Sequence, residues 1–95
     1  MHVELSRFIE SDLEQIADWI AEDNPRRAVT FIQEIREAFR RIADGPLHYQ
    51  LRPDIGEDAR IAVVGNYVIL FRVDDQAIRI ERVVFGGRDL PRILQ

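Results

Sequence analysis

The segment between Asn24 and Gly45 restricts the possible folds of this chain more than any other segment. Asn24 followed by Pro25 is a typical helix start, and Gly45 followed by Pro46 is a typical helix end. The apolar residues between them recur at helical spacing: Ala28, Phe31, Ile32, Ile35, Phe39 and Ile42. We therefore expect a long amphipathic helix whose apolar face must be covered by the rest of the chain.

A strand and a first helix are expected before this segment. The alternation of apolar and polar residues from His2 to Phe8 is typical of a short strand with one buried face. Ser11 and Glu14 have the spacing of a capping box, so the first helix should begin there and end near Asp23. Its apolar residues are Leu13, Ile16, Ala17 and Ile20. Because the two helices are so close in sequence, they should pair as an antiparallel hairpin.

The C-terminal half is rich in β-branched and aromatic residues, divided by short turn signals. Three strands are expected there: Ala59–Val64, Tyr67–Val73 and Ala77–Phe85. Their short connections make them an antiparallel meander. The apolar residues of the last strand change phase near Glu81 and Arg82, which indicates either two covered faces or a β-bulge. The tail from Asp89 onward forms either one helical turn or a loose end.

Together these elements predict an α+β fold: a strand, an antiparallel helix hairpin, a three-stranded antiparallel meander and a short C-terminal tail. A chain of 95 residues has material for one hydrophobic core, so residues 1–95 are expected to form a single domain. Its apolar stretches are far shorter than the ~20 residues of a membrane span. The first residues lack the basic start and apolar run of an export signal. We therefore expect a cytoplasmic protein that does not contact membranes.

Charge and composition exclude several classes of function. The net charge is −4, which disfavours direct binding to nucleic acid, because phosphate contacts need an excess of positive charge. No cysteine is present, and His2 and His48 are far apart in sequence, so we expect no metal site. Gly86-Gly87 lacks the pattern of a phosphate-binding loop. Neither a cofactor nor a catalytic nucleophile is predicted.

The charged residues divide into an acidic and a basic group. The acidic residues of the first helix are predicted to form its solvated face: Asp12, Glu14, Asp18, Glu22 and Asp23. The arginines of the strand region are the better candidates for function: Arg60, Arg72, Arg79, Arg82 and Arg88. Adjacent strands could place several of them on one concave face that binds an acidic protein segment or an RNA phosphate. The alternative is an exposed sheet face with ordinary ion pairs.

The second half also resembles a known family. Residues 65–74, GNYVILFRVD, are similar to the strand of RelE/ParE toxins that reads Gly-x-Tyr-x-hydrophobic-x-Tyr-x-Val. Residues 77–90 resemble the closing strand of that family and its Gly-x-Arg-Asp ending. The order of elements agrees over essentially the whole chain. The resemblance implies the toxin of a type II toxin-antitoxin system, associated with plasmid stabilisation and growth arrest, and a cognate antitoxin as its partner.

The two branches of this superfamily imply different targets. The RelE branch implies ribosome-dependent mRNA cleavage by a set of basic residues and a C-terminal tyrosine. Arg60 and Arg88 match basic positions, but Ala62 and Val68 occupy two others, and no tyrosine follows Tyr67. The ParE branch implies noncatalytic inhibition of DNA gyrase, and it fits better. An mRNA endonuclease and an inactive homologue that only binds an antitoxin stay as alternatives.

The resemblance also suggests where partners bind. We expect an apolar, arginine-rimmed groove across the helix hairpin and the sheet, which a disordered antitoxin segment fills as it folds. The residues predicted to bind the target or the antitoxin are Arg60, Arg72, Arg82, Arg88, Asp89, Leu90 and Leu94. No residue is assigned a catalytic role.

Overall fold

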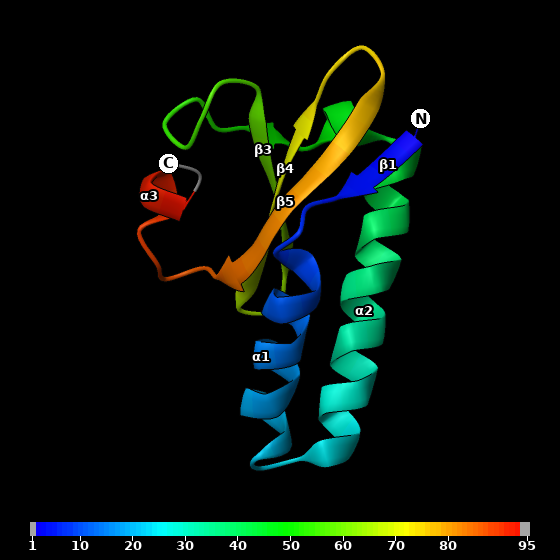
Figure 1. Ribbon diagram of the computed structural model, residues 1–95, viewed down its shortest axis with the longest axis vertical. Helices are drawn as coiled ribbons and strands as arrows, with labels where there is room; N and C mark the ends of the chain where they lie inside the picture. The colour runs from blue at the N-terminus through cyan, green and yellow to red at the C-terminus, as the bar shows by residue number, and fades with distance from the viewer. Residues whose placement is uncertain (1, 94–95) are drawn as a thin grey trace.

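The computed structural model describes residues 2–93 as a helix hairpin packed against a mixed β-sheet (Figure 1). The elements in chain order are β1 (His2–Leu5), α1 (Ile9–Ala21), α2 (Pro25–Asp44), the 3-10 turn η1 (Pro46–His48), β2 (Gln50–Leu51), β3 (Ala59–Val64), β4 (Tyr67–Val73), β5 (Ala77–Phe85) and α3 (Leu90–Ile93). The predicted α+β class and the order of strand, helix hairpin and meander are confirmed.

Helix α2 has the limits that its flanking residues predict. The side-chain oxygen of Asn24 accepts a hydrogen bond from the backbone N–H of Arg27 at 3.1 Å, and Pro25 occupies the first helical position. The helix ends at Asp44, and Gly45 follows as its C-cap. Local sequence signals are therefore sufficient to define this helix.

Helix α1 begins earlier than the capping box predicted, and the capping box is not formed. Ser11 lies inside the first turn, where its hydroxyl accepts a hydrogen bond from the Gln15 side chain. Ser6 holds the helix entry instead. Its hydroxyl accepts from the backbone N–H of Phe8 at 3.2 Å and donates to the carbonyl of Glu81 at 2.6 Å. The strand-to-helix connection is thus fixed by a contact with β5 that is remote in sequence.

The sheet has five strands in the order β1-β5-β4-β3-β2. The predicted antiparallel meander of β3, β4 and β5 is confirmed. Two edge pairings add to it: β1 lies parallel to β5, and the short strand β2 is antiparallel to β3. At the β4–β5 turn, one carboxylate oxygen of Asp74 accepts from the backbone N–H groups of Gln76 and Ala77. These hydrogen bonds hold the pKa of the Asp74 carboxyl below its ordinary value.

The phase change in β5 is a β-bulge. Leu70 pairs with Arg82, but the next residue of β4, Phe71, pairs with Ile80, so Glu81 is the additional residue. Because of this additional residue, Ile80 and Val83 point to the same side of the sheet although they are an odd number of residues apart. Both faces of the sheet are also covered by apolar residues.

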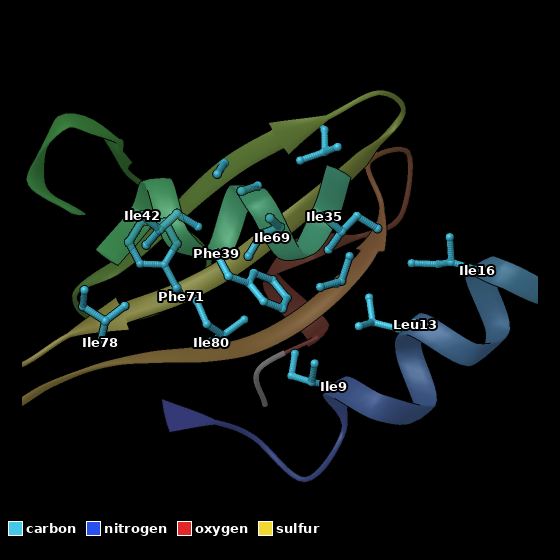
Figure 2. Close-up of a cluster of buried hydrophobic side chains, with 14 of the residues drawn as sticks. Ile9, Leu13, Ile16, Ile35, Phe39, Ile42, Ile69, Phe71, Ile78 and Ile80 are labelled. Atoms are coloured by element: carbon cyan, nitrogen blue, oxygen red, sulfur yellow. The ribbon is translucent and has the colours of Figure 1, made fainter. Parts of the chain in front are cut away.

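The larger hydrophobic core lies between the helix hairpin and the sheet. In Figure 2, α1 contributes Ile9, Leu13 and Ile16, α2 contributes Ile35, Phe39 and Ile42, and the strands contribute Ile69, Phe71, Ile78 and Ile80. A smaller cluster covers the second face of the sheet: Ile55, Ala59, Val68, Leu70, Val84 and Leu90. Within residues 2–93, none of the helices combines the length and apolar character needed to cross a bilayer.

The buried stripe of α2 should be required for stability. Ile35 is fully buried in the larger core, so Ile35→Ala is expected to lower the free energy of unfolding by about 2 to 5 kcal/mol. Urea unfolding measures this change. Val29→Ala, an exposed position on the same helix, should change it by less than about 0.5 kcal/mol. Equal effects at the two positions would contradict the packing of α2 described above.

Candidate functional site

An apolar groove lies where the helix hairpin meets one end of the sheet. It has a volume of about 620 Å³ and includes residues from α1, α2, β5 and the β3–β4 turn region. Its lining residues are Trp19, Ile20, Arg27, Phe31, Gly65, Asn66, Tyr67 and Phe85. We call this cavity the aromatic groove. Its size is within the range of about 300 to 1,000 Å³ that is usual for ligand sites.

Three aromatic rings that line the groove form a continuous row. The ring centroids of Phe31 and Tyr67 are 5.6 Å apart, and those of Tyr67 and Phe85 are 5.9 Å apart with an edge-to-face angle of 82°. Such pairs contribute roughly 0.5 to 1.5 kcal/mol each beyond burial. The row therefore connects α2, β4 and β5 and gives the groove a defined shape.

Two glycines allow the rings to occupy these positions. Gly65 has a φ of +57°, and a Cβ atom there would lie 3.2 Å from the Phe31 ring. A Cβ atom on Gly87 would lie 2.7 Å from the Phe85 ring, which is too close for any real contact. A side chain at either position would therefore displace an aromatic ring of the groove.

The groove has the exposed apolar surface that is typical of a protein-binding site. Trp19 is 68 % exposed and Phe85 is 50 % exposed, and large apolar side chains gathered in solvent indicate an interaction surface. Arg27 lies at the rim with its guanidinium 5.1 Å from the centre of the Phe31 ring, and it also forms an ion pair with Glu34. An apolar groove lined by one arginine thus lies between the helix hairpin and the sheet. This arginine, Arg27, is not one of the residues that were predicted from the sequence to bind a partner, and the use of the groove by an antitoxin stays a prediction.

A smaller hollow of about 180 Å³ adjoins the aromatic groove, because both cavities include Tyr67 and Phe85. The other residues around it are Asp12, Gln15, Ile16, Arg82, Val83, Val84 and Arg88. We call it the Arg88 hollow. Its lining is more polar than that of the groove and includes two of the predicted site arginines.

The wall between α1 and β5 is held by a buried ion pair. Asp12 is only 6 % exposed, and its two carboxylate oxygens accept hydrogen bonds from Nε and Nη2 of Arg82 at 2.8 and 2.9 Å. One of these oxygens also accepts from the backbone N–H of Val83 at 3.0 Å. The hydrogen bond with Asp12 raises the pKa of the Arg82 guanidinium. The guanidinium also lies 5.0 Å from the centre of the Phe8 ring.

The prediction that Asp12 belongs to the solvated face of the first helix is therefore wrong. A signal for its burial was present in the sequence. Asp12 lies at helical spacing from Ile9 and Ile16 and directly precedes Leu13, so it is part of the buried stripe. The partner of Asp12 is 70 residues away and is positioned by the bulge, and no local pattern could identify it.

The structure does not bring the strand arginines onto one concave face. Arg60 lies on the helix side of β3, where its guanidinium donates to the carbonyl of Tyr49 at 2.7 Å. Arg72 alternates with Leu70 and so lies on the second face of the sheet, beside Arg79 of β5. The predicted convergence of the arginines is wrong because neighbouring positions along each strand point to opposite faces.

The C-terminal tail forms one helical turn, α3, which is the first of its two predicted forms. Asp89 and Arg92 are both exposed and form an ion pair at 3.2 Å. Leu90 is only 8 % exposed and packs in the smaller cluster. Contrary to the prediction, its side chain is therefore not an exposed anchor for a partner. Leu94 lies outside the described residues. Among residues 2–93, no group of three histidine or acidic side chains is arranged to hold a metal ion.

Comparisons with known proteins agree with this geometry. A family model described as "ParE toxin of type II toxin-antitoxin system, parDE" matches residues 3–90. The comparison with curated proteins found no match. A solved structure described as "Chromosomal ParDE TA system from P. aeruginosa" has a similar fold, with a TM-score of 0.77 and 23 % sequence identity over 90 % of this chain and 95 % of that chain. At this level of identity, the structural likeness establishes a shared fold.

Loss of the buried Asp12 carboxylate should lower the stability of the fold. Asp12→Ala leaves the Arg82 guanidinium and the Val83 N–H without their acceptor, so we expect the free energy of unfolding to fall by roughly 2 to 4 kcal/mol. Asp18→Ala, an exposed acidic position on the same helix, is the matched control and should change it by less than about 0.5 kcal/mol. Thermal unfolding of both variants measures the difference. If the two variants were equally stable, the ion pair would not hold α1 to β5.

Proposed function

The chain belongs to the ParE toxin family of type II toxin-antitoxin systems, and we propose that it inhibits DNA gyrase without catalysis until its antitoxin occupies the aromatic groove. Membership of the family makes it the toxin component of such a system, with a cognate antitoxin as its partner. The gyrase target, the cytoplasmic location where gyrase acts, and the treatment of residues 1–95 as one toxin domain are parts of the proposal.

The burial of two positions supports a noncatalytic mechanism more than any other observation. The RelE branch implies basic residues where this chain has Ala62 and Val68. Both side chains are buried here, Ala62 against the helix hairpin and Val68 in the cluster on the second face of the sheet. Neither position could present a charge to an RNA phosphate without disrupting a hydrophobic core.

The two arginines that do match the RelE branch are far apart along the sheet. In the sheet register, Arg60 pairs with Phe71, which in turn pairs with Ile80. Arg88 follows Phe85, which pairs with Tyr67 toward the other end of β4. The four residue-to-residue steps from position 60 to position 64 of β3 span roughly 13 Å at the usual rise of a strand. Arg60 also donates to a backbone carbonyl. These positions favour separate roles over a shared phosphate clamp.

The aromatic groove is the surface that best suits an antitoxin. It is apolar, preformed by the row of rings, and bordered by exposed Trp19 and Phe85. A disordered segment that folds on contact can bury such a surface and repay its ordering entropy through the apolar area removed from water. Residues from both helices and the sheet would then be covered at once.

The target prediction is tested by two assays in parallel. Purified toxin is expected to inhibit DNA supercoiling by gyrase and to leave mRNA on translating ribosomes uncut. Toxin already bound to the antitoxin encoded in the neighbouring reading frame is the control, and it should leave supercoiling unchanged. Codon-specific mRNA cuts with unchanged supercoiling would assign the chain to the RelE-like alternative. Inactivity in both assays, with antitoxin binding retained, would identify an inactive homologue.

The groove prediction is tested by fluorescence, because Trp19 is the single tryptophan of the chain and lies in the groove. Binding of the purified antitoxin should shift its emission to shorter wavelength, and calorimetry should give a large negative heat-capacity change. Phe85→Ala is expected to weaken binding at least tenfold, about 1.4 kcal/mol or more, because it removes an exposed aromatic anchor.

The matched control is Leu47→Ala, which removes an exposed apolar side chain that does not line the groove. It should leave the affinity unchanged. Tight antitoxin binding without a Trp19 signal and with equal affinities for the two variants would place the antitoxin elsewhere on the toxin.

A further inference from the structure

We propose that the Arg88 hollow is a carboxylate-binding extension of the aromatic groove. The antitoxin segment would then carry large apolar side chains for the groove and, next to them, an acidic side chain that pairs with Arg88. This inference rests on the proposed assignment of the groove to the antitoxin. It specifies the chemistry of the bound segment and the place on the toxin where its acidic side chain lies.

The two cavities are adjacent. Tyr67 and Phe85 line both of them, so a segment lying across the aromatic groove reaches the hollow by passing these two rings. The groove offers aromatic rings, whereas the hollow offers the guanidinium of Arg88 and the amide of Gln15 on α1. A segment with apolar side chains at one end and an acidic side chain at the other would match the groove and the hollow in turn.

Arg88 supplies the positive charge that is not already compensated. Three arginines line the two cavities. Arg27 pairs with Glu34, and Arg82 forms a bidentate pair with Asp12. Within residues 2–93, Arg88 forms no ion pair, and it is exposed. The combined surface is therefore positive at the hollow, and it lacks an equivalent unpaired charge at the Arg27 rim.

The backbone fixes the position of this charge relative to the groove. The N–H of Arg88 donates to the carbonyl of Phe85 at 3.1 Å, and the N–H of Gly86 donates to the carbonyl of Asn66 at 2.8 Å. The turn after β5 is thus tied to the β3–β4 turn. Since Gly87 leaves room for the Phe85 ring, the aromatic anchor and the arginine are held next to each other by the same four residues.

A side-chain carboxylate suits the hollow better than a nucleic-acid phosphate. Phosphate backbones are bound by several cations, and the hollow has a single unpaired one with the carboxylate of Asp12 in its wall. One charge-assisted hydrogen bond is enough to select an acidic residue at one position of a protein segment. We therefore favour an acidic protein segment as the occupant.

Charge reversal tests the inference directly. Arg88→Glu is expected to weaken binding of the full-length antitoxin by about tenfold or more, and Arg88→Gln should weaken it less and reduce the salt dependence of the affinity. Arg40→Glu, the same change at an exposed position of α2 outside both cavities, should leave the affinity within about twofold of wild type. Titrations followed by Trp19 emission and by calorimetry measure all three.

The outcomes separate this inference from the groove proposal. If Phe85→Ala weakens binding but Arg88→Glu behaves like Arg40→Glu, the groove holds the antitoxin and the acidic pairing is wrong. If neither Phe85→Ala nor Arg88→Glu weakens binding, the groove proposal fails and the inference fails with it. Replacing one acidic residue of the antitoxin by arginine should restore binding to Arg88→Glu. Failure of every such single replacement would overturn a pairwise contact.

Discussion

The arrangement of this fold depends on the contact between Asp12 and the bulged part of β5. The additional residue Glu81 changes the phase of the strand and leaves the N–H of Val83 directed at the Asp12 carboxylate. Arg82 then supplies two further hydrogen bonds to the same carboxylate. The Asp12 carboxylate therefore accepts a hydrogen bond from the free N–H at the bulge, neutralises the charge of Arg82 and joins α1 to the sheet. The walls of both cavities are positioned by this junction.

Most of the fold could be predicted from the sequence because its signals are local. Helix α2 and the strands β3, β4 and β5 are bounded by caps and turns within a few residues, and the structure has them at the predicted limits. The remaining elements depend on distant partners. Strand β1 pairs with β5 in parallel, and the two-residue strand β2 exists only because β3 lies beside it. The start of α1 was misplaced for the same reason, since Ser6 is held by Glu81.

The presence of an apolar groove could be predicted from the sequence, but the residues that line it could not. An apolar groove is expected from two amphipathic helices that cannot cover their own faces, but none of the residues that line the aromatic groove was among those predicted to bind a partner. The grouping of the arginines did not follow, because the sheet is covered on both faces and alternation separates Arg60 from Arg72. The aromatic row was also hidden, since Phe31, Tyr67 and Phe85 come from three elements and meet only in the folded chain.

The pairing of β1 with β5 affects when the fold can be completed during synthesis. Residues 2–5 pair with residues 77–80, so the first strand has no partner until the last one has left the ribosome. The same late segment supplies Phe85 to the groove and Arg82 to Asp12. An incomplete nascent chain therefore lacks a closed sheet, a finished groove and a partner for its buried acid. The groove that we propose for the antitoxin is therefore complete only after β5 has been synthesised.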